Sequence, residues 1–137
     1  MSEAPKLEPL RILVADDNVE GGHLLSALLS QRGHHVVVAP SGEDAVRMAK
    51  EFRPEVGMLD IGMPGMSGYE LAEHFRNDPV HRGMYLIAVT GWGQEEDRRQ
   101  AMEAGFDAHV TKPADPDELT VLLAGRFPTT QTGRRTE

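Results

Sequence analysis

Short apolar runs recur along the chain at similar intervals, with little alternation of polar and apolar residues inside them. The five runs are ILVA at 12–15, VVVA at 36–39, VGML at 56–59, LIAV at 86–89 and a weaker AHV at 108–110. Continuous apolar runs of this length are typical of strands that are buried on both faces of a parallel sheet. The pattern therefore predicts five short parallel strands.

The segments between these runs carry apolar residues at helical spacing. One segment follows the i, i+3, i+4, i+7 pattern of a helix face, with Ala45, Met48, Ala49 and Phe52. Four further segments carry shorter apolar stripes, at 24–29, 71–75, 101–102 and 119–123. Strands and helices that alternate in this way predict an α/β fold of five βα units, with right-handed crossovers and helices on both faces of the sheet.

Length and composition limit what such a domain can do. The chain has 137 residues, which suits one domain, and we expect it to span 10–127 between flexible ends at 1–9 and 128–137. The net charge of −8 disfavours a nucleic-acid partner, because phosphate backbones require clustered Lys and Arg. The chain has no cysteine, no apolar signal segment and no run long enough to span a bilayer. We therefore expect a cytoplasmic protein without membrane insertion.

Residues with reactive side chains follow four of the five predicted strands. The first run ends in Asp16 and Asp17, the third in Asp60, the fourth in Thr90 and the fifth in a segment that contains Lys112. In an open parallel sheet, ligands bind beyond the carboxyl ends of the strands. Each residue taken alone has a simpler explanation, such as a helix cap or a turn. Taken together, three acids at one edge repel each other and require a cation or a lysine.

The type of donor atom indicates which cation this would be. Oxygen ligands select hard cations, and Mg²⁺ prefers sites with one or two carboxylates, waters and phosphoryl oxygens. None of the six histidines has zinc-like spacing beside the acids. An aspartate carboxylate can also attack phosphorus to form an acyl phosphate, while a metal, a lysine and a hydroxyl group neutralise the charge that develops.

These segments resemble one known family, the response-regulator receiver domains of two-component systems. The resemblance runs from about Arg11 to Phe127 and includes ILVADDN, MLDIGMPGMSGYEL, AVTG and AHVTKP. It implies a flavodoxin-like three-layer sandwich with a five-stranded parallel sheet in the order 2-1-3-4-5. It also implies that Asp60 is phosphorylated, and that Asp16, Asp17, Asp60 and the carbonyl group of Gly62 bind Mg²⁺.

The resemblance assigns further residues to catalysis and switching. Thr90 and Lys112 correspond to the residues that contact the phosphoryl group, and the bond before Pro113 is typically cis in the family. The family usually has Tyr or Phe where this chain has His109. That aromatic ring turns inward as the threonine moves toward the phosphoryl group. A titratable ring at this position predicts an altered switch.

A second departure from the family pattern is Trp92, which lies two residues after Thr90. In the family that this chain resembles, the residues two positions after the phosphoacceptor and two after the threonine flank the path of the hydrolytic water. Here those residues are Gly62 and Trp92, and neither offers a side-chain group that would orient a water molecule. We therefore expect Trp92 to modulate the site and the aspartyl phosphate to hydrolyse slowly.

The expected function is that of a signalling phosphoacceptor rather than a turnover enzyme. The phosphoryl donor would be a phosphohistidine on a histidine kinase or a phosphotransfer protein, and the chain would be a monomer or weak homodimer. It would act alone or come from a hybrid histidine kinase, whose receivers the segment TGWGQEEDRRQAMEAGFDAHVTKP resembles.

Two alternatives remain open at this point. One is a receiver-like interaction module that works without phosphorylation. The other is a phosphatase with an aspartate nucleophile, although such enzymes typically place two aspartates two residues apart after the first strand. Asp16 and Asp17 are adjacent.

Overall fold

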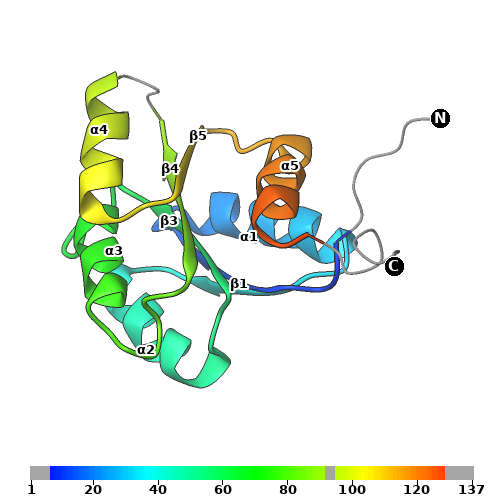
Figure 1. Ribbon diagram of the computed structural model, residues 1–137, viewed down its shortest axis with the longest axis horizontal. Helices are drawn as coiled ribbons and strands as arrows, with labels where there is room; N and C mark the ends of the chain where they lie inside the picture. Colours follow the sequence, from blue (N-terminus) through cyan, green and yellow to red (C-terminus); the bar gives the residue numbers. More distant parts are fainter. Residues whose placement is uncertain (1–6, 92–94, 129–137) are drawn as a thin grey trace.

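The computed structural model describes residues 7–91 and 95–128, and Figure 1 shows a central sheet with helices on both faces. The elements are β1 (Arg11–Ala15), α1 (Val19–Gln31), β2 (His35–Ala39), α2 (Gly42–Phe52), β3 (Val56–Asp60), α3 (Gly68–Arg76), β4 (Tyr85–Thr90), α4 (Glu95–Ala104), β5 (Ala108–Thr111) and α5 (Pro116–Arg126). The strands are parallel and their order is β2-β1-β3-β4-β5. The predicted fold class and strand order are confirmed, whereas most of the two ends that we expected to be flexible lies outside the described residues.

Successive side chains of each strand enter two different apolar cores. In β1, Ile12 and Val14 pack with residues of α1 and α5, whereas Leu13 and Ala15 pack with residues of α2, α3 and α4. Figure 1 shows the same division, with α1 and α5 on one face of the sheet and the other three helices on the opposite face. Strands β3 and β4 are buried along their whole length, which explains their continuous apolar runs.

The predicted leucine stripe of α1 is buried only in part. Leu29 is 1% exposed, but Leu24 is 63% exposed. The helix approaches the sheet through the buried Gly22, where a Cβ atom would lie 3.0 Å from the Val38 side chain. Leu25 and Leu28 are half-buried and line a cleft beside the loop that follows β5. Part of the stripe therefore faces this cleft instead of the core. None of the helices within the described residues is long and apolar enough to cross a membrane.

Polar caps set where the helices begin. Ser41 and Ser67 cap α2 and α3, which agrees with the preference for serine at the start of helices. Helix α1 is capped by Asn18, whose side chain accepts a hydrogen bond from the backbone of the first turn. The simpler explanation that Asp16 or Asp17 caps this helix is therefore wrong. Both carboxylates remain available to the edge of the sheet.

A buried histidine joins the start of β1 to the turn before β2. The Nδ1 atom of His34 accepts a hydrogen bond from the backbone N–H of Leu10 at 3.1 Å, and His34 is 5% exposed. Burial lowers the pKa of His34 below its usual value of 6.5, and electrostatic interactions with His35 and Arg32 lower it further. The neutral ring is therefore the form that this fold stabilises.

This histidine gives a prediction for the pH dependence of stability. Because the pKa of His34 is lower in the folded state, the unfolded chain binds more protons, and the free energy of unfolding should fall as the pH falls below 6.5. His34→Asn retains a hydrogen-bond acceptor but cannot titrate, so urea unfolding of this variant should depend less on pH. An equally steep pH dependence in both proteins would contradict the role given to His34.

Candidate functional site

The predicted functional residues meet at the carboxyl edge of the sheet. Asp60 is the last residue of β3, and Thr90 is the last residue of β4. Strands β1 and β5 are each extended at their carboxyl ends by one backbone hydrogen bond. The N–H of Asp16 donates to the carbonyl of Ala39 at 3.0 Å, and the N–H of Lys112 donates to the carbonyl of Thr90 at 2.7 Å. Hydrogen bonds of the sheet therefore fix the backbone at the residues that carry these side chains.

A cluster of three carboxylates forms at this edge. One oxygen from each of Asp16, Asp17 and Asp60 lies within 4.8 Å of the others. The Lys112 Nζ atom lies 3.0 Å from Asp60 Oδ2 and 3.8 Å from Asp16 Oδ2. One ammonium group therefore offsets three carboxylates, and an excess of negative charge remains when all of the acids are ionised.

The two carboxylates beside Lys112 are oriented in the same way. Asp16 Oδ1 accepts a hydrogen bond from the N–H of Asn18 at 2.9 Å, and Asp60 Oδ1 accepts one from the N–H of Gly62 at 2.9 Å. Each acid is therefore tied to the backbone two residues further along the chain. In both cases the other oxygen, Oδ2, faces the Lys112 ammonium group.

Burial and charge act against each other in this cluster. Burial raises the pKa of Asp16, and the neighbouring Asp60 raises it further, while the Asn18 hydrogen bond and the Lys112 charge lower it. Burial alone would lower the pKa of Lys112, but the hydrogen bond to Asp60 and the surrounding negative charges raise it. The ammonium group is therefore held in its charged form.

The loop after β3 folds back closely onto the end of that strand. A Cβ atom on Gly68 would lie 2.6 Å from both the Asp60 carbonyl oxygen and the Ile61 Cα atom. Only glycine fits this contact, which brings the first turn of α3 against the end of β3. Met63 is buried and Met66 packs against the same core, so both methionines have a packing role.

His109 lies on the face of the sheet that α4 covers. It pairs with Ala88 in the β4–β5 register, and strand alternation places its side chain on the same face as that of Thr90. Among the described residues, the buried Nε2 atom of His109 has no hydrogen-bond partner. Burial lowers the pKa of His109, and the Arg98 charge acts in the same direction while Asp97 opposes it. The proposed switch role remains a prediction.

Further expectations concern the surroundings of Asp60. The Lys112–Pro113 peptide bond is cis, as the family resemblance implies. Gly62 is exposed and donates its N–H to Asp60. Trp92 lies outside the described residues, so its modulating role and the slow hydrolysis of the phosphoryl group stay predictions.

A cleft of about 420 Å³ opens beside the carboxylates. Its lining includes Asp16 and Lys112 together with Leu25, Leu28 and Pro113. Leucines of α1 thus give the cleft an apolar part, and Asp16 and Lys112 give it a charged part. A ligand in this cleft would contact the functional groups directly.

Sequence reasoning missed two residues that shape the site. Asn18 ties Asp16 to the first turn of α1, and an asparagine directly before a helical pattern is a recognisable cap signal. Gly68 permits the close approach of α3. No spacing rule indicates that contact, because it depends on how the chain folds back after β3.

The fold and the charged edge define a parallel α/β domain with three clustered carboxylates that could hold a metal ion. The family model of the response regulator receiver domain matches residues 12–124, and the chain therefore belongs to this family of two-component signalling domains. Protein PilH of Pseudomonas aeruginosa is 34% identical over 119 residues, which cover 84% of this chain and 98% of PilH.

Solved structures show the same relationship. A CheY-like response regulator receiver domain protein from Methanospirillum hungatei superimposes with a TM-score of 0.78 at 27% identity, over 87% of this chain and 94% of that one. The receiver domain of a sensor histidine kinase from Pseudomonas aeruginosa, solved with a magnesium ion coordinated in its active-site cleft, gives a TM-score of 0.78 at 27% identity. That match covers 86% of this chain and 97% of the other.

The Gly68 contact gives a prediction for stability. Gly68→Ala would place a methyl group 2.6 Å from backbone atoms of Asp60 and Ile61, so the end of β3 or the start of α3 must move. Overpacking of this kind costs about 1–3 kcal/mol, measurable by urea unfolding. The matched control is Gly125→Ala in α5, where a Cβ atom meets nothing within 4 Å, and this change should stabilise the helix by up to about 1 kcal/mol. Equal effects of the two substitutions would contradict the proposed close contact.

Proposed function

We propose that this receiver domain accepts a phosphoryl group on Asp60 in a Mg²⁺-dependent reaction and signals through a conformational change. The observation that carries the proposal is the position of Lys112 Nζ, 3.0 Å from Asp60 Oδ2 in a cluster of three carboxylates. The donor would be a phosphohistidine on a histidine kinase or a phosphotransfer protein, since receiver domains act with such partners.

The donor atoms of the cluster suit Mg²⁺. Its oxygens lie within 4.8 Å of one another, they come from carboxylates, and their charge exceeds that of the single Lys112 ammonium group. Asp17 and Asp60 would bind the ion, with Asp16 binding directly or through water and with the Gly62 carbonyl as a further ligand. A bound Mg²⁺ would supply neutralisation of the charge on the phosphoryl oxygens. The magnesium ion in the similar Pseudomonas receiver structure supports this choice.

The transfer itself requires a nucleophile and a fixed positive charge. An Asp60 carboxylate oxygen forms the new O–P bond while the bond between phosphorus and the donor imidazole nitrogen breaks. The electron pair of the broken bond stays on that nitrogen, which remains with the donor. Lys112 would pair with one phosphoryl oxygen, and the Thr90 hydroxyl group would donate a hydrogen bond to another.

Asp60 is better placed than the other two acids to act as the nucleophile. It ends β3, which lies in the middle of the sheet, and it has the shorter contact to Lys112. Asp17 is exposed, and Asp16 lies further from the ammonium group. We infer that the signal then passes from Thr90 to His109, which face α4 from neighbouring strands.

Asp60→Asn should abolish phosphorylation. With acetyl phosphate and Mg²⁺, the wild-type chain should gain the mass of one phosphoryl group by intact mass spectrometry, and the variant should gain none, because an amide is not a nucleophile toward phosphorus. EDTA should stop labelling of the wild-type chain while leaving its circular dichroism spectrum unchanged. Equal labelling of the Asn variant would refute the assignment, and turnover of p-nitrophenyl phosphate would revive the phosphatase alternative.

Lys112→Ala should separate metal binding from phosphoryl transfer. Removal of the Lys112 charge removes its repulsion of the divalent ion, so Mg²⁺ binding should strengthen by about 1–2 kcal/mol, or about fivefold to thirtyfold, for separations of about 4–8 Å at the dielectric constant of water. The same change should slow labelling by acetyl phosphate, because the phosphoryl oxygens lose a cation.

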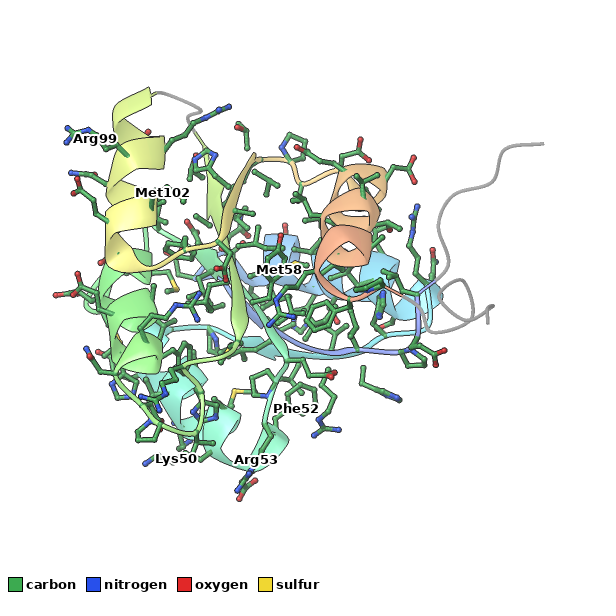
Figure 2. All side chains as sticks on the ribbon, in the orientation of Figure 1. Lys50, Phe52, Arg53, Met58, Arg99 and Met102 are labelled. Carbon is green, nitrogen blue, oxygen red and sulfur yellow. The ribbon has the colours of Figure 1, made fainter. Side chains whose placement is uncertain are left out.

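The matched control for this variant is Lys50→Ala. Lys50 is exposed near the end of α2, and Figure 2 shows it far from the loop that follows β5. Calorimetric Mg²⁺ titrations should give the same affinity for this control as for the wild-type chain. If Lys112→Ala also matched the wild-type chain in affinity and labelling rate, its role at the site would be wrong.

A further inference from the structure

One residue joins the first turn of α1 to the carboxylate cluster. The side-chain oxygen of Asn18 accepts a hydrogen bond from the Gly21 N–H at 3.1 Å, and its backbone carbonyl accepts one from the Gly22 N–H at 3.0 Å. In the other direction, the Asn18 N–H donates to Asp16 Oδ1 at 2.9 Å. Asn18 therefore caps the helix and holds an acid at the same time.

These bonds determine which oxygen Asp16 presents to the cluster. The cap fixes the backbone of Asn18 in an extended conformation, with φ −84° and ψ 101°, and so fixes the direction of its N–H. That N–H occupies Oδ1 of Asp16. The remaining oxygen, Oδ2, faces the Lys112 ammonium group at 3.8 Å.

We propose that Asn18 is a positioning residue for the cation site, because its helix-capping side chain holds the peptide that orients the Asp16 carboxylate. The inference rests on the proposed Mg²⁺-dependent function and adds to it a residue that does not itself touch the ion. In protein metal sites, groups that orient a ligand in this way are nearly as important as the ligand.

The two backbone tethers of the cluster differ in a way that makes this role testable. Asp60 is held by the N–H of Gly62, which has no side chain, so that tether depends on the backbone alone. Asp16 is held by a residue whose side chain is itself anchored in a helix cap. A side-chain substitution at Asn18 should therefore disturb Asp16 while leaving the Asp60 tether in place.

The experiment measures Mg²⁺ affinity of the full chain by titration calorimetry. Asn18→Ala removes the cap and should weaken binding by about tenfold, the lower end of the range for groups that orient metal ligands. Asn18→Ser keeps a good capping side chain and should keep the wild-type affinity. Unchanged affinity in the Ala variant, or equal loss in the Ser variant, would overturn the proposal.

A control at another helix cap distinguishes a general loss of stability from the specific loss of the Asn18 cap. Ser41 caps α2 through the N–H of Asp44 at 3.0 Å and has no part in holding a carboxylate of the cluster. Ser41→Ala should therefore destabilise the fold by a similar amount in urea unfolding without changing Mg²⁺ affinity. Equal weakening of Mg²⁺ binding by Ser41→Ala and Asn18→Ala would show a general effect of stability and overturn the proposal.

A measurement on the metal-free protein tests the hydrogen bond directly. The amide of residue 18 should exchange slowly with deuterium in the wild-type and Ser41→Ala chains, and faster in Asn18→Ala. If Asn18→Ala weakened Mg²⁺ binding without faster exchange of the residue 18 amide, the proposal that the cap acts through this N–H would be overturned. Failure of the wild-type chain to bind Mg²⁺ would refute the proposed function instead, and the exchange rates would still decide whether the cap of Asn18 holds Asp16.

Discussion

The ion pair between Lys112 and Asp60 is the interaction on which the functional edge depends. Three carboxylates lie with oxygens within 4.8 Å of one another, and like charges this close disfavour ionisation of the group as a whole. The lysine ammonium contacts two of them, at 3.0 Å and 3.8 Å. The remaining excess of negative charge favours binding of a divalent cation, and in the proposed function the same excess charge would link metal binding to phosphoryl acceptance.

The fold holds the carboxylates close together by fixing the backbone of the residues that carry them. Parallel strands bring separate segments of the chain to one edge, and β3 carries Asp60 in the middle of the sheet. Hydrogen bonds from Asn18 and Gly62 then take up one oxygen of each buried acid. The carboxylates cannot simply rotate away from each other, so their repulsion is balanced by Lys112 and by the backbone. A preorganised site of this kind would require little rearrangement when a cation or a phosphoryl group binds.

Most of the fold and the main residues of the site could be predicted from the sequence, because both follow local rules. Continuous apolar runs predicted strands buried on both faces, and the ends of those strands predicted where Asp60 and Lys112 would meet. The sequence did not predict that Leu24 would be exposed or that Gly68 would contact the β3 backbone. Both depend on the distance at which a helix packs on the sheet, and helical periodicity carries no information about that distance. The role of Asn18 was missed because a cap signal describes a helix, not the acid that precedes it.

The most direct test of this account is a crystal structure grown with Mg²⁺ and beryllofluoride, a mimic of the phosphoryl group. The account predicts beryllium bonded to an Asp60 carboxylate oxygen and a magnesium ion in contact with Asp17 and Asp60. It also predicts that one fluoride accepts a hydrogen bond from Lys112 and another accepts one from Thr90. Beryllofluoride on a different residue, or bound to Asp60 with no metal ion in contact with the carboxylates, would contradict it.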